Sequence, residues 1–453
     1  MNFRTTIITA LIFAIGLAAV LLINRQDEKK AEITKIEGKL LNITKDKVNE
    51  IQLQPANIQI VKDGQDWKIV APVETEGDKS SIDALINMFD WAKVERVVST
   101  DPAEYADFGL VPGYGQMIIA TDSTADTLYV GDKNPTGSFV FARKSGAPDV
   151  FVTTTTLQTN IEKELYDLRN KTVLSFDINN VREILLITKT ANMSLTKTGN
   201  DWNITKPGNV KADNAEVNKI TNRLNSETAK EFVDENPDNL QKYGLNRPTV
   251  KVDLFLGENR AKKTLLIGKS RNDKYYAKDE SRKPVFMVDS AFVHIFNKSV
   301  TDLRNKDVTD FNQMSADRLE LNYSGNTVVC EKDTADNWVV VTPDSGKAQN
   351  YKISSMIREI SGLKVEQFVS DSPKSLGAYG LSNPQLSCKI FNNDQLLTAL
   401  LLGKEKADNI YAKTTDVKSV YLVKKDILDK LKPKLEDILE EKQEEISTES
   451  EKM

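Results

Sequence analysis

Paired carboxylates are the first residues in this sequence whose types could support catalysis. The chain of 453 residues contains 66 Asp and Glu residues. Pairs such as Glu162 with Glu164, or Glu366 with Asp371, could act as general acid and general base in a hydrolysis. A chain this rich in acids produces such pairs by chance, and none recurs in the internal repeats described below. We therefore interpret them as solvated surface residues and expect no enzyme, with a carboxylate hydrolase as the least favoured hypothesis.

The histidine and cysteine content restricts the remaining chemistry. His294 is the only histidine, which excludes sites that need a histidine cluster, and two cysteines cannot form a four-cysteine zinc site. His294 lies among apolar residues of an expected helix, without a nucleophile motif beside it, and we interpret it as an ordinary helix residue. Cys330 and Cys388 align with apolar positions of other repeats and are interpreted as core residues. A disulfide between them stays open as an alternative if the body lies outside the cytoplasm.

One segment resembles the end of a phosphate-binding loop. Gly268, Lys269 and Ser270 read Gly-Lys-Ser. Such a loop needs an earlier glycine so that backbone amides can surround the anion, and Lys263 occupies that position. We therefore predict no nucleotide site, and we predict no metal and no other cofactor.

Three copies of one unit follow each other along the chain. The same landmarks recur in one order at intervals of 135 to 137 residues. They are a tryptophan (Trp67, Trp202, Trp338), a proline (Pro72, Pro207, Pro343), a turn glycine (Gly109, Gly244, Gly380) and a strand-end glycine (Gly131, Gly268, Gly403). A DLRNK motif begins at Asp167 and Asp302 and decays to DILEE at Asp437. The repeated order predicts tandem homologous domains.

These repeated residues are mostly of structural types. A buried tryptophan removes roughly 200 Å² from water, so we interpret the three tryptophans as core anchors. An exposed tryptophan that stacks on a ligand is the alternative. Glycine beside proline is typical of turns, because glycine supplies a positive φ and proline a fixed one. We predict that none of the landmarks is catalytic.

Six cations also recur in the three copies. Three lysines follow the strand-end glycine and three cations follow an aromatic-Ala pair: Lys133, Lys269 and Lys404, with Arg143, Lys278 and Lys413. Together they could form a repeated anion-binding edge. Lysines at sheet edges also discourage aggregation, and we favour that interpretation.

Each repeat predicts an α+β domain with a largely antiparallel sheet. Alternating apolar residues indicate about seven strands, and helical spacing indicates two helices, one after the proline and one that closes the repeat at DLRNK. The strand order does not follow from the sequence. The predicted parts are an anchor and linker at 1–40, repeat domains at 41–175, 176–310 and 311–441, and a disordered acidic tail at 442–453.

The N-terminal segment predicts a transmembrane helix. Nineteen residues from Thr5 to Ile23 carry no charge, and as a helix they would span roughly 28 Å, about one bilayer core. The apolar region of a cleaved signal peptide is usually shorter, so we favour an uncleaved anchor. Basic residues after the helix (Arg25, Lys29, Lys30) favour a cytoplasmic body. A short N-terminal tail favours export, and we predict a single-pass membrane protein with a periplasmic or otherwise extracytoplasmic body.

The composition excludes some classes of protein. The formal net charge is −5, which disfavours a nucleic-acid-binding chain. Hydrophobic residues make up 40% of the sequence, as in ordinary globular proteins, so a fully disordered chain is also excluded.

The combination of landmarks resembles the bacterial domain-of-unknown-function 4340 (DUF4340) family, from the anchor to about Glu441. Members of that family are often encoded beside gliding-type ABC transporter components. The resemblance implies an extracytoplasmic scaffold or accessory subunit of such a membrane complex, with transporter subunits as partners and no established catalytic residue. Two departures are the VPGYG that follows Leu110 in the first copy and the incomplete DLRNK of the third. The alternative hypothesis is an envelope module that binds glycan, lipid or peptide.

Overall fold

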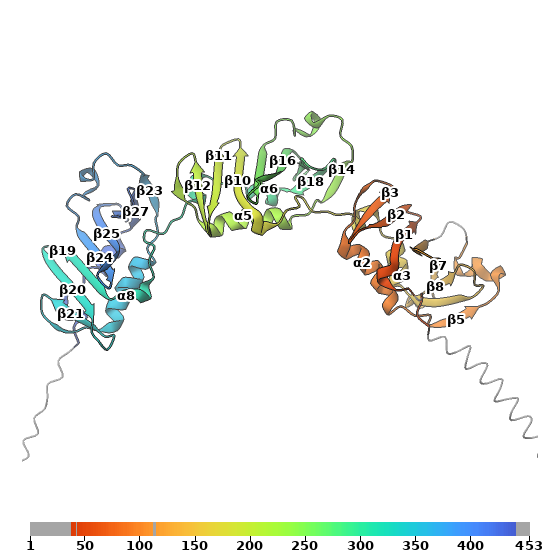
Figure 1. Ribbon diagram of the computed structural model, residues 1–453, viewed down its shortest axis with the longest axis horizontal. Helices are drawn as coiled ribbons and strands as arrows, with labels where there is room; N and C mark the ends of the chain where they lie inside the picture. Colours follow the sequence, from red (N-terminus) through yellow and green to blue (C-terminus); the bar gives the residue numbers. More distant parts are fainter. Residues whose placement is uncertain (1–37, 42, 112–114, 441–453) are drawn as a thin grey trace, which may run out of the picture. The chain divides into compact units, whose positions relative to one another are not determined.

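Three antiparallel sheets follow one another along the chain. The computed structural model describes residues 38–41, 43–111 and 115–440. Within them each sheet has nine strands, and the first has the order β4-β3-β2-β1-β6-β7-β8-β9-β5 (Figure 1). The second and third sheets repeat this order with their own strands. The predicted tandem array of largely antiparallel sheets is therefore confirmed.

The strands keep the same succession in each sheet. The first sheet has β1 (Val48–Gln54), β2 (Ile58–Asp63), β3 (Asp66–Ala71), β4 (Thr75–Glu76), β5 (Arg96–Ser99), β6 (Gln116–Thr121), β7 (Ala125–Lys133), β8 (Phe139–Lys144) and β9 (Val150–Thr154). The second has β10 (Val181–Thr188), β11 (Asn192–Thr198), β12 (Asp201–Lys206), β13 (Val210–Lys211), β14 (Glu231–Asp234), β15 (Val250–Leu256), β16 (Ala261–Arg271), β17 (Lys274–Asp279) and β18 (Val285–Asp289). The third has β19 (Arg318–Tyr323), β20 (Asn326–Lys332), β21 (Trp338–Thr342), β22 (Gly346–Lys347), β23 (Gln367–Ser370), β24 (Leu386–Asn392), β25 (Gln395–Lys406), β26 (Asn409–Thr414) and β27 (Val420–Lys424).

The prediction of about seven strands for each repeat is wrong, because two strands were missed. One is the second strand of the first hairpin, represented by β2, in which Ile58 and Ile60 are buried and alternate with half-exposed residues. The other is the two-residue strand represented by β4, which is too short to produce a periodic pattern.

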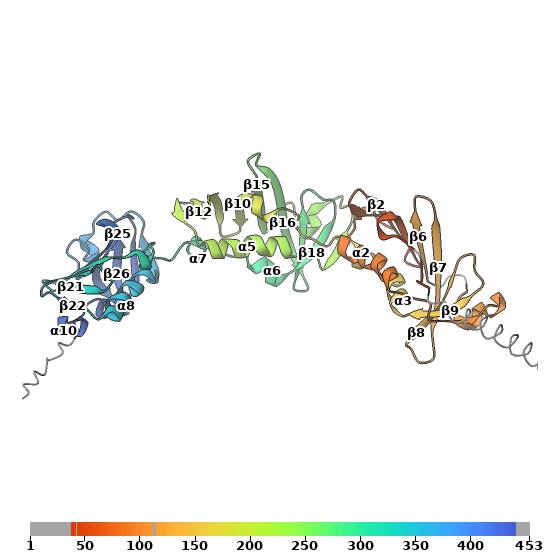
Figure 2. The same ribbon diagram turned by 60° about the horizontal axis from the view of Figure 1, so that its bottom comes forward.

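The helices cover less of the chain than the strands. They are α2 (Lys79–Asn87), α3 (Thr156–Ile161), α4 (Leu165–Leu168), α5 (Asn214–Ser226), α6 (Ser290–His294), α7 (Val300–Leu303), α8 (Asn350–Ser361), α9 (Asp426–Lys430) and α10 (Leu435–Ile438). Short 3₁₀ helices are η1 (Lys45–Lys47), η2 (Met88–Asp90), η3 (Pro102–Phe108), η4 (Ile178–Asn180), η5 (Leu240–Tyr243), η6 (Gln313–Ser315) and η7 (Gly377–Tyr379). Each repeat thus has one longer helix, α2, α5 or α8, which lies along its sheet (Figures 1 and 2).

The expected closing helix of each repeat is two short helices instead of one. In the second repeat α6 ends at His294, and α7 begins after Ser299. The Ser299 side chain accepts a hydrogen bond from the Asp302 amide, and the Asp302 side chain accepts one from the Ser299 amide. This capping box starts a new helix, because it satisfies amides that a continuous helix would bond internally.

In the first and third repeats the core lies between the longer helix and the sheet. In the first, Ile82 and Leu85 of α2 belong to one buried cluster with Ile51 and Leu53 of β1. In the third, Ile353 and three further apolar residues of α8 join Leu319 of the sheet in a second cluster. The spacing of the apolar residues on these helices is what places one face of each against the strands.

The compact units of the chain do not coincide with the repeats. One unit is Met1–Ile178 with Arg223–Lys251 and Lys263–His294, and the other is Asn179–Asn222 with Val252–Lys262 and Ile295–Met453. The middle sheet contributes to both, so the repeat domain boundaries stay a prediction.

The expected anchor and tail lie outside the described residues. Among the described helices, none combines the length and apolar character needed to cross a bilayer.

Candidate functional site: the joints between sheets

In the DLRNK motif, two consecutive residues form backbone hydrogen bonds with two different repeats. The Asn170 amide donates to the Glu76 carbonyl of the first repeat at 2.8 Å, and the next residue, Lys171, accepts from the Ala229 amide of the second repeat at 2.7 Å. The following motif does the same. Asn305 donates to Lys211 at 2.9 Å, and the Lys306 carbonyl accepts from Val365 at 2.7 Å. The connections between sheets are therefore short and hydrogen-bonded on both sides.

The arginine of the first DLRNK motif makes what we call the first joint. Its residues are Arg169, Phe232 and Glu235, all within one compact unit. The Arg169 guanidinium lies 3.4 Å from the centre of the Phe232 ring. Its two terminal nitrogens donate to the two Glu235 oxygens, at 2.5 and 3.0 Å. Arg169 is only 2% exposed, so its ring contact is shielded from water, whereas the Glu235 side chain of the ion pair is 26% exposed.

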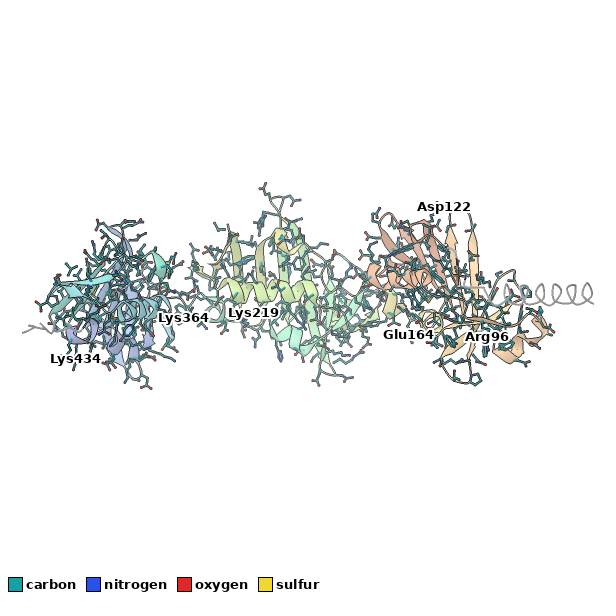
Figure 3. The ribbon with its side chains drawn as sticks, turned by 90° about the horizontal axis from the view of Figure 1, so that it is seen from below. Arg96, Asp122, Glu164, Lys219, Lys364 and Lys434 are labelled. Carbon is teal, nitrogen blue, oxygen red and sulfur yellow. The ribbon has the colours of Figure 1, made fainter. Side chains whose placement is uncertain are left out.

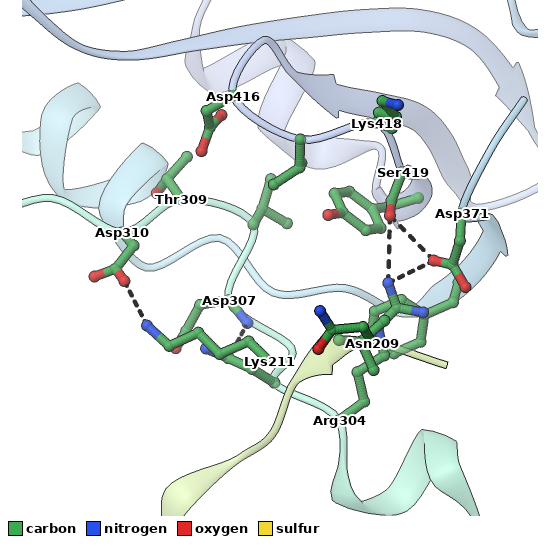
Figure 4. Close-up of a pocket in the computed structure, with 16 residues that line it drawn as sticks. Asn209, Lys211, Arg304, Asp307, Thr309, Asp310, Asp371, Asp416, Lys418 and Ser419 are labelled. Carbon is green, nitrogen blue, oxygen red and sulfur yellow. Dashed lines mark hydrogen bonds and ion pairs between the residues drawn. The ribbon is translucent and has the colours of Figure 1, made fainter. Parts of the chain in front are cut away.

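The second joint repeats this arrangement with Arg304, Phe368 and Asp371. The Arg304 guanidinium lies 3.8 Å from the centre of the Phe368 ring and donates to Asp371 Oδ1 at 2.6 Å. The Ser419 hydroxyl donates to the same carboxylate oxygen at 3.0 Å, and Figure 4 shows these three groups together. The hydrogen bond from Arg304 holds the pKa of Asp371 below its ordinary value. One residue type thus has the same role at both joints.

At the two outer ends of the described array, other residue types occupy the aligned positions. The counterparts of Phe232 and Glu235 in the first repeat are Val97 and Thr100, and the counterpart of Arg169 in the third repeat is Leu439. Leu439 packs against the core of its own repeat. At these aligned positions, the arginine, the aromatic ring and the acid are therefore all present at the two connections between described sheets.

A pocket of about 460 Å³ lies beside the second joint. Its lining includes Arg304 and Asp371, and Val417 is one of its apolar residues. Lys211 donates to Asp310 Oδ2 at 2.7 Å on the other side of the pocket (Figure 4). The lining contains four aspartates and three basic residues: Asp307, Asp310, Asp371 and Asp416, with Lys211, Arg304 and Lys418. Its formal charge is therefore slightly negative.

A family model described as "Domain of unknown function (DUF4340)" matches residues 67–203, 202–338 and 338–450. The chain belongs to the DUF4340 family. Each of the first two DUF4340 segments contains one whole DLRNK motif, and so one joint arginine. The resemblance inferred from the sequence is thereby confirmed.

Comparisons with individual proteins add no functional argument for this DUF4340 chain. No curated protein matches it. A DNA polymerase sliding clamp from Pseudomonas aeruginosa, solved with ligand, is 6% identical, with 87% of this chain and 95% of the clamp covered and a TM-score of 0.14. The DNA polymerase III subunit beta of Pseudomonas aeruginosa is 7% identical, with 69% and 83% covered and a TM-score of 0.13. Scores this low carry no inference about fold or function.

The structure places the repeated DUF4340 tryptophans in the interior. Trp67, Trp202 and Trp338 are 3%, 2% and 4% exposed. The Trp67 indole N–H donates to Asp83 on α2 at 3.1 Å, and that of Trp202 donates to Asn218 on α5 at 3.3 Å. The prolines Pro72, Pro207 and Pro343 follow these strands and are each preceded by a cis peptide bond.

The two repeated glycines meet where a 3₁₀ helix crosses a long strand. A Cβ atom on Gly131, Gly268 or Gly403 would lie 2.0 to 2.2 Å from the carbonyl oxygen of Phe108, Tyr243 or Tyr379. The residue after each of these aromatics is the turn glycine, Gly109, Gly244 or Gly380, with φ near +70°. Only glycine permits this approach of two backbones without displacement.

The six recurring cations do not share one environment. Lys278 and Lys413 donate to backbone carbonyls of their own hairpins, and burial lowers the pKa of both. The Arg143 guanidinium lies 3.8 Å from the centre of the Tyr129 ring. Lys269 contacts the Gln241 carbonyl at 3.4 Å, whereas Lys133 and Lys404 are exposed. The favoured sheet-edge interpretation stays a prediction, and the anion-binding edge stays its alternative.

The cysteines are separate, buried thiols. Cys330 pairs across strands with Leu319, and Cys388 pairs with Leu321, so strand β19 lies between them. Both thiols are free, because strands two positions apart are separated by roughly 9 to 10 Å. The disulfide alternative is therefore wrong in this structure.

Among the residues that the structure describes, no group of three or more His, Cys, Asp or Glu could hold a metal ion.

The sequence analysis did not single out the two joint arginines as candidate residues. Their signal was the DLRNK recurrence at Asp167 and Asp302 and its loss at Asp437. A second signal was the change from Phe232 and Phe368 to Val97 at one aligned position. Neither signal shows that the arginine contacts the phenylalanine, because the two residues lie in different repeats.

Proposed function

We propose that this chain is a membrane-anchored, extracytoplasmic scaffold or accessory subunit that performs no catalysis. Its partner would be a membrane complex of the ABC-transporter type, as the family resemblance implies. The observation that carries the proposal is the pair of joints, in which Arg169 and Arg304 connect consecutive sheets by the same contacts. Residues that recur for cohesion between repeats suit a protein whose task is to hold or space a partner.

The energetics of the joints support a coupled array. A shielded cation–π contact contributes about 0.5 to 2 kcal/mol, and a hydrogen-bonded ion pair adds to it. Each connection also has backbone hydrogen bonds on both sides, so bending there disturbs several interactions together. Two joints of this kind would limit the freedom of the repeats and present them to a partner in a restricted set of arrangements.

The test is affinity purification of the tagged full chain from native membranes, followed by mass spectrometry. Transporter subunits are expected with the unmodified chain, and their recovery should fall about tenfold in the double variant Arg169→Ala, Arg304→Ala. Arg247→Ala is the matched control, because Arg247 is exposed and belongs to neither joint. Recovery of the chain without a transporter subunit or other envelope partner would count against the proposal.

The location is a separate part of the proposal and needs its own measurement. A reporter fused after residue 453 should report an extracytoplasmic C-terminus if Thr5–Ile23 is an export anchor. A cytoplasmic signal would overturn the proposed orientation while leaving the role of the joints open.

The second candidate is an envelope ligand-binding module, and the pocket beside Arg304 favours it. A scaffold and a binding module differ in what they need from the joints. Ligand binding at one pocket should survive Arg169→Ala, whereas assembly with a partner that contacts several repeats should not.

A further inference from the structure

At the first joint, Arg282 fixes the connecting segment by a second set of contacts. Its terminal nitrogen Nη2 donates to the carbonyl oxygens of Thr172 and Val173, the latter at 3.0 Å. Its Nε atom lies 3.2 Å from Asp279 Oδ2, which orients the guanidinium. The chain therefore already contains one example of a guanidinium bound by the segment that joins two sheets.

Val417 occupies the corresponding backbone position at the second joint. The two residues are one repeat interval apart in the sequence. The Lys278 ammonium donates to the Arg282 carbonyl, and the Lys413 ammonium donates to the Val417 carbonyl. The two hairpins are thus held by the same lysine contact, but the Val417 side chain has no group that can donate a hydrogen bond.

The pocket lies where Val417 replaces arginine. Val417 lines it and is 37% exposed. Asp307 and Val308, the counterparts of Thr172 and Val173, line it as well. With a volume of about 460 Å³, the pocket can hold a side chain the size of arginine.

We propose that this pocket binds a guanidinium group of a ligand, in the way that the connecting segment of the first joint binds Arg282. The ligand would donate to the carbonyl oxygens of Asp307 and Val308. Asp416 lines the same pocket and supplies negative charge, whereas Asp371 and Asp310 are already engaged by Arg304 and Lys211 (Figure 4).

The geometry favours a guanidinium over a simple ammonium. Two adjacent carbonyls and a nearby carboxylate match a planar group with several donors in a fixed fork. The group could belong to an arginine side chain of a polypeptide or to a small guanidinium compound. The inference goes beyond the scaffold proposal, because it concerns one pocket and depends on neither the anchor nor a transporter.

Calorimetric titration of the purified full chain tests the proposal with three small probes. Arginine amide should bind about tenfold more tightly than citrulline amide, which has the same shape but no charge, and more tightly than lysine amide. A Gly-Arg-Gly peptide identifies the source. If it binds about tenfold better than arginine amide, the natural group belongs to a polypeptide. Equal affinities indicate a small guanidinium compound.

Substitutions in the pocket provide the matched comparison. Val417→Arg supplies the guanidinium from the chain itself and should weaken arginine amide binding about tenfold. Val417→Ala keeps the pocket open and should retain binding, while Asp416→Asn should weaken it about threefold. Equal binding of arginine amide and citrulline amide, or no binding of either, overturns the proposal. So does full affinity in a folded Val417→Arg variant, and Asp416→Asn provides the comparison if that variant does not fold.

Discussion

The guanidinium of Arg169 lies 3.4 Å from the ring centre of Phe232, a residue of the next repeat. Arg304 and Phe368 have the same relationship at 3.8 Å. The aligned residues Val97 and Leu439 show that the pair is not a general feature of the fold. At these aligned positions the pair is present at both connections between described sheets, which is why we assign it a role in joining them.

The Arg169–Glu235 pair should show strong coupling in a double-mutant cycle. Single replacement of either residue by alanine leaves the other charge at the joint without its partner, whereas the double replacement removes both. Chemical denaturation should give a coupling free energy of about 1 to 3 kcal/mol. The exposed pair Lys68 and Glu74 is the control, and its coupling is expected to be much weaker because water screens both charges. Additive effects at Arg169 and Glu235 would contradict the account of the first joint.

Trp202→Ala should destabilise the second repeat by about 3 to 5 kcal/mol, the range for emptying a large aromatic site. Trp202→Phe should cost less, because the phenyl ring retains much of the packing and loses mainly the hydrogen bond to Asn218. The free energy of unfolding of the full chain measures both. An unchanged melting transition in Trp202→Ala would show that the residue is not part of the core in solution.

Gly268→Ala should be strongly unfavourable for a different reason. The new methyl group would lie 2.1 Å from the Tyr243 carbonyl oxygen, so backbone must move. We expect a loss of about 1 to 3 kcal/mol, as for other overpacked sites. Gly208→Ala is the matched control, because no atom lies within 4 Å of its added Cβ. Similar stability of the two variants would contradict the close approach of strand and turn.

The cysteines should be unreactive until the third repeat unfolds. Burial raises the pKa of Cys330 to about 12 and also raises that of Cys388. At pH 8 the Cys330 thiol is therefore protonated and unreactive, and burial blocks access as well. A thiol reagent should label an introduced Lys219→Cys at once, and the native cysteines only in denaturant. Rapid labelling without denaturant would show that the third core opens.

The same thiols give a pH dependence with a defined sign. Their folded pKa values lie above the unfolded value of about 8.5, so the folded state binds more protons between those values. The contribution of the buried neutral thiols to stability is kept below about pH 8.5 and falls as the pH rises towards the folded values. Cys330→Val should reduce this alkaline loss, as measured by denaturation at several pH values.

The sequence predicted the tandem sheets because homologous landmarks such as Trp67 and Trp202 mark equivalent positions. It did not predict the strand β4, since two residues carry no period, nor the break before α7, where Ser299 caps a new helix. The contact between Arg169 and Phe232 could not be predicted, because it depends on the strand order of the second sheet. Phe232 lies on β14, which pairs with β18 at the edge of its sheet, and that order could not be derived from spacing.

Distance distributions between spin labels test the joints most directly. Labels at Asp122→Cys and Glu280→Cys span the first joint, and labels at Lys219→Cys and Lys434→Cys span the second, so that each pair lies within one compact unit. Figure 3 labels Asp122, Lys219 and Lys434. All four positions are exposed, and the buried native cysteines should stay unlabelled.

The account predicts a single narrow distribution across each joint in the unmodified background. Arg169→Ala should broaden the distribution across the first joint alone, Arg304→Ala that across the second alone, and Arg247→Ala neither. Distributions that are already broad, or that stay equally narrow after both joint arginines are removed, would contradict the claim that these arginines couple the repeats.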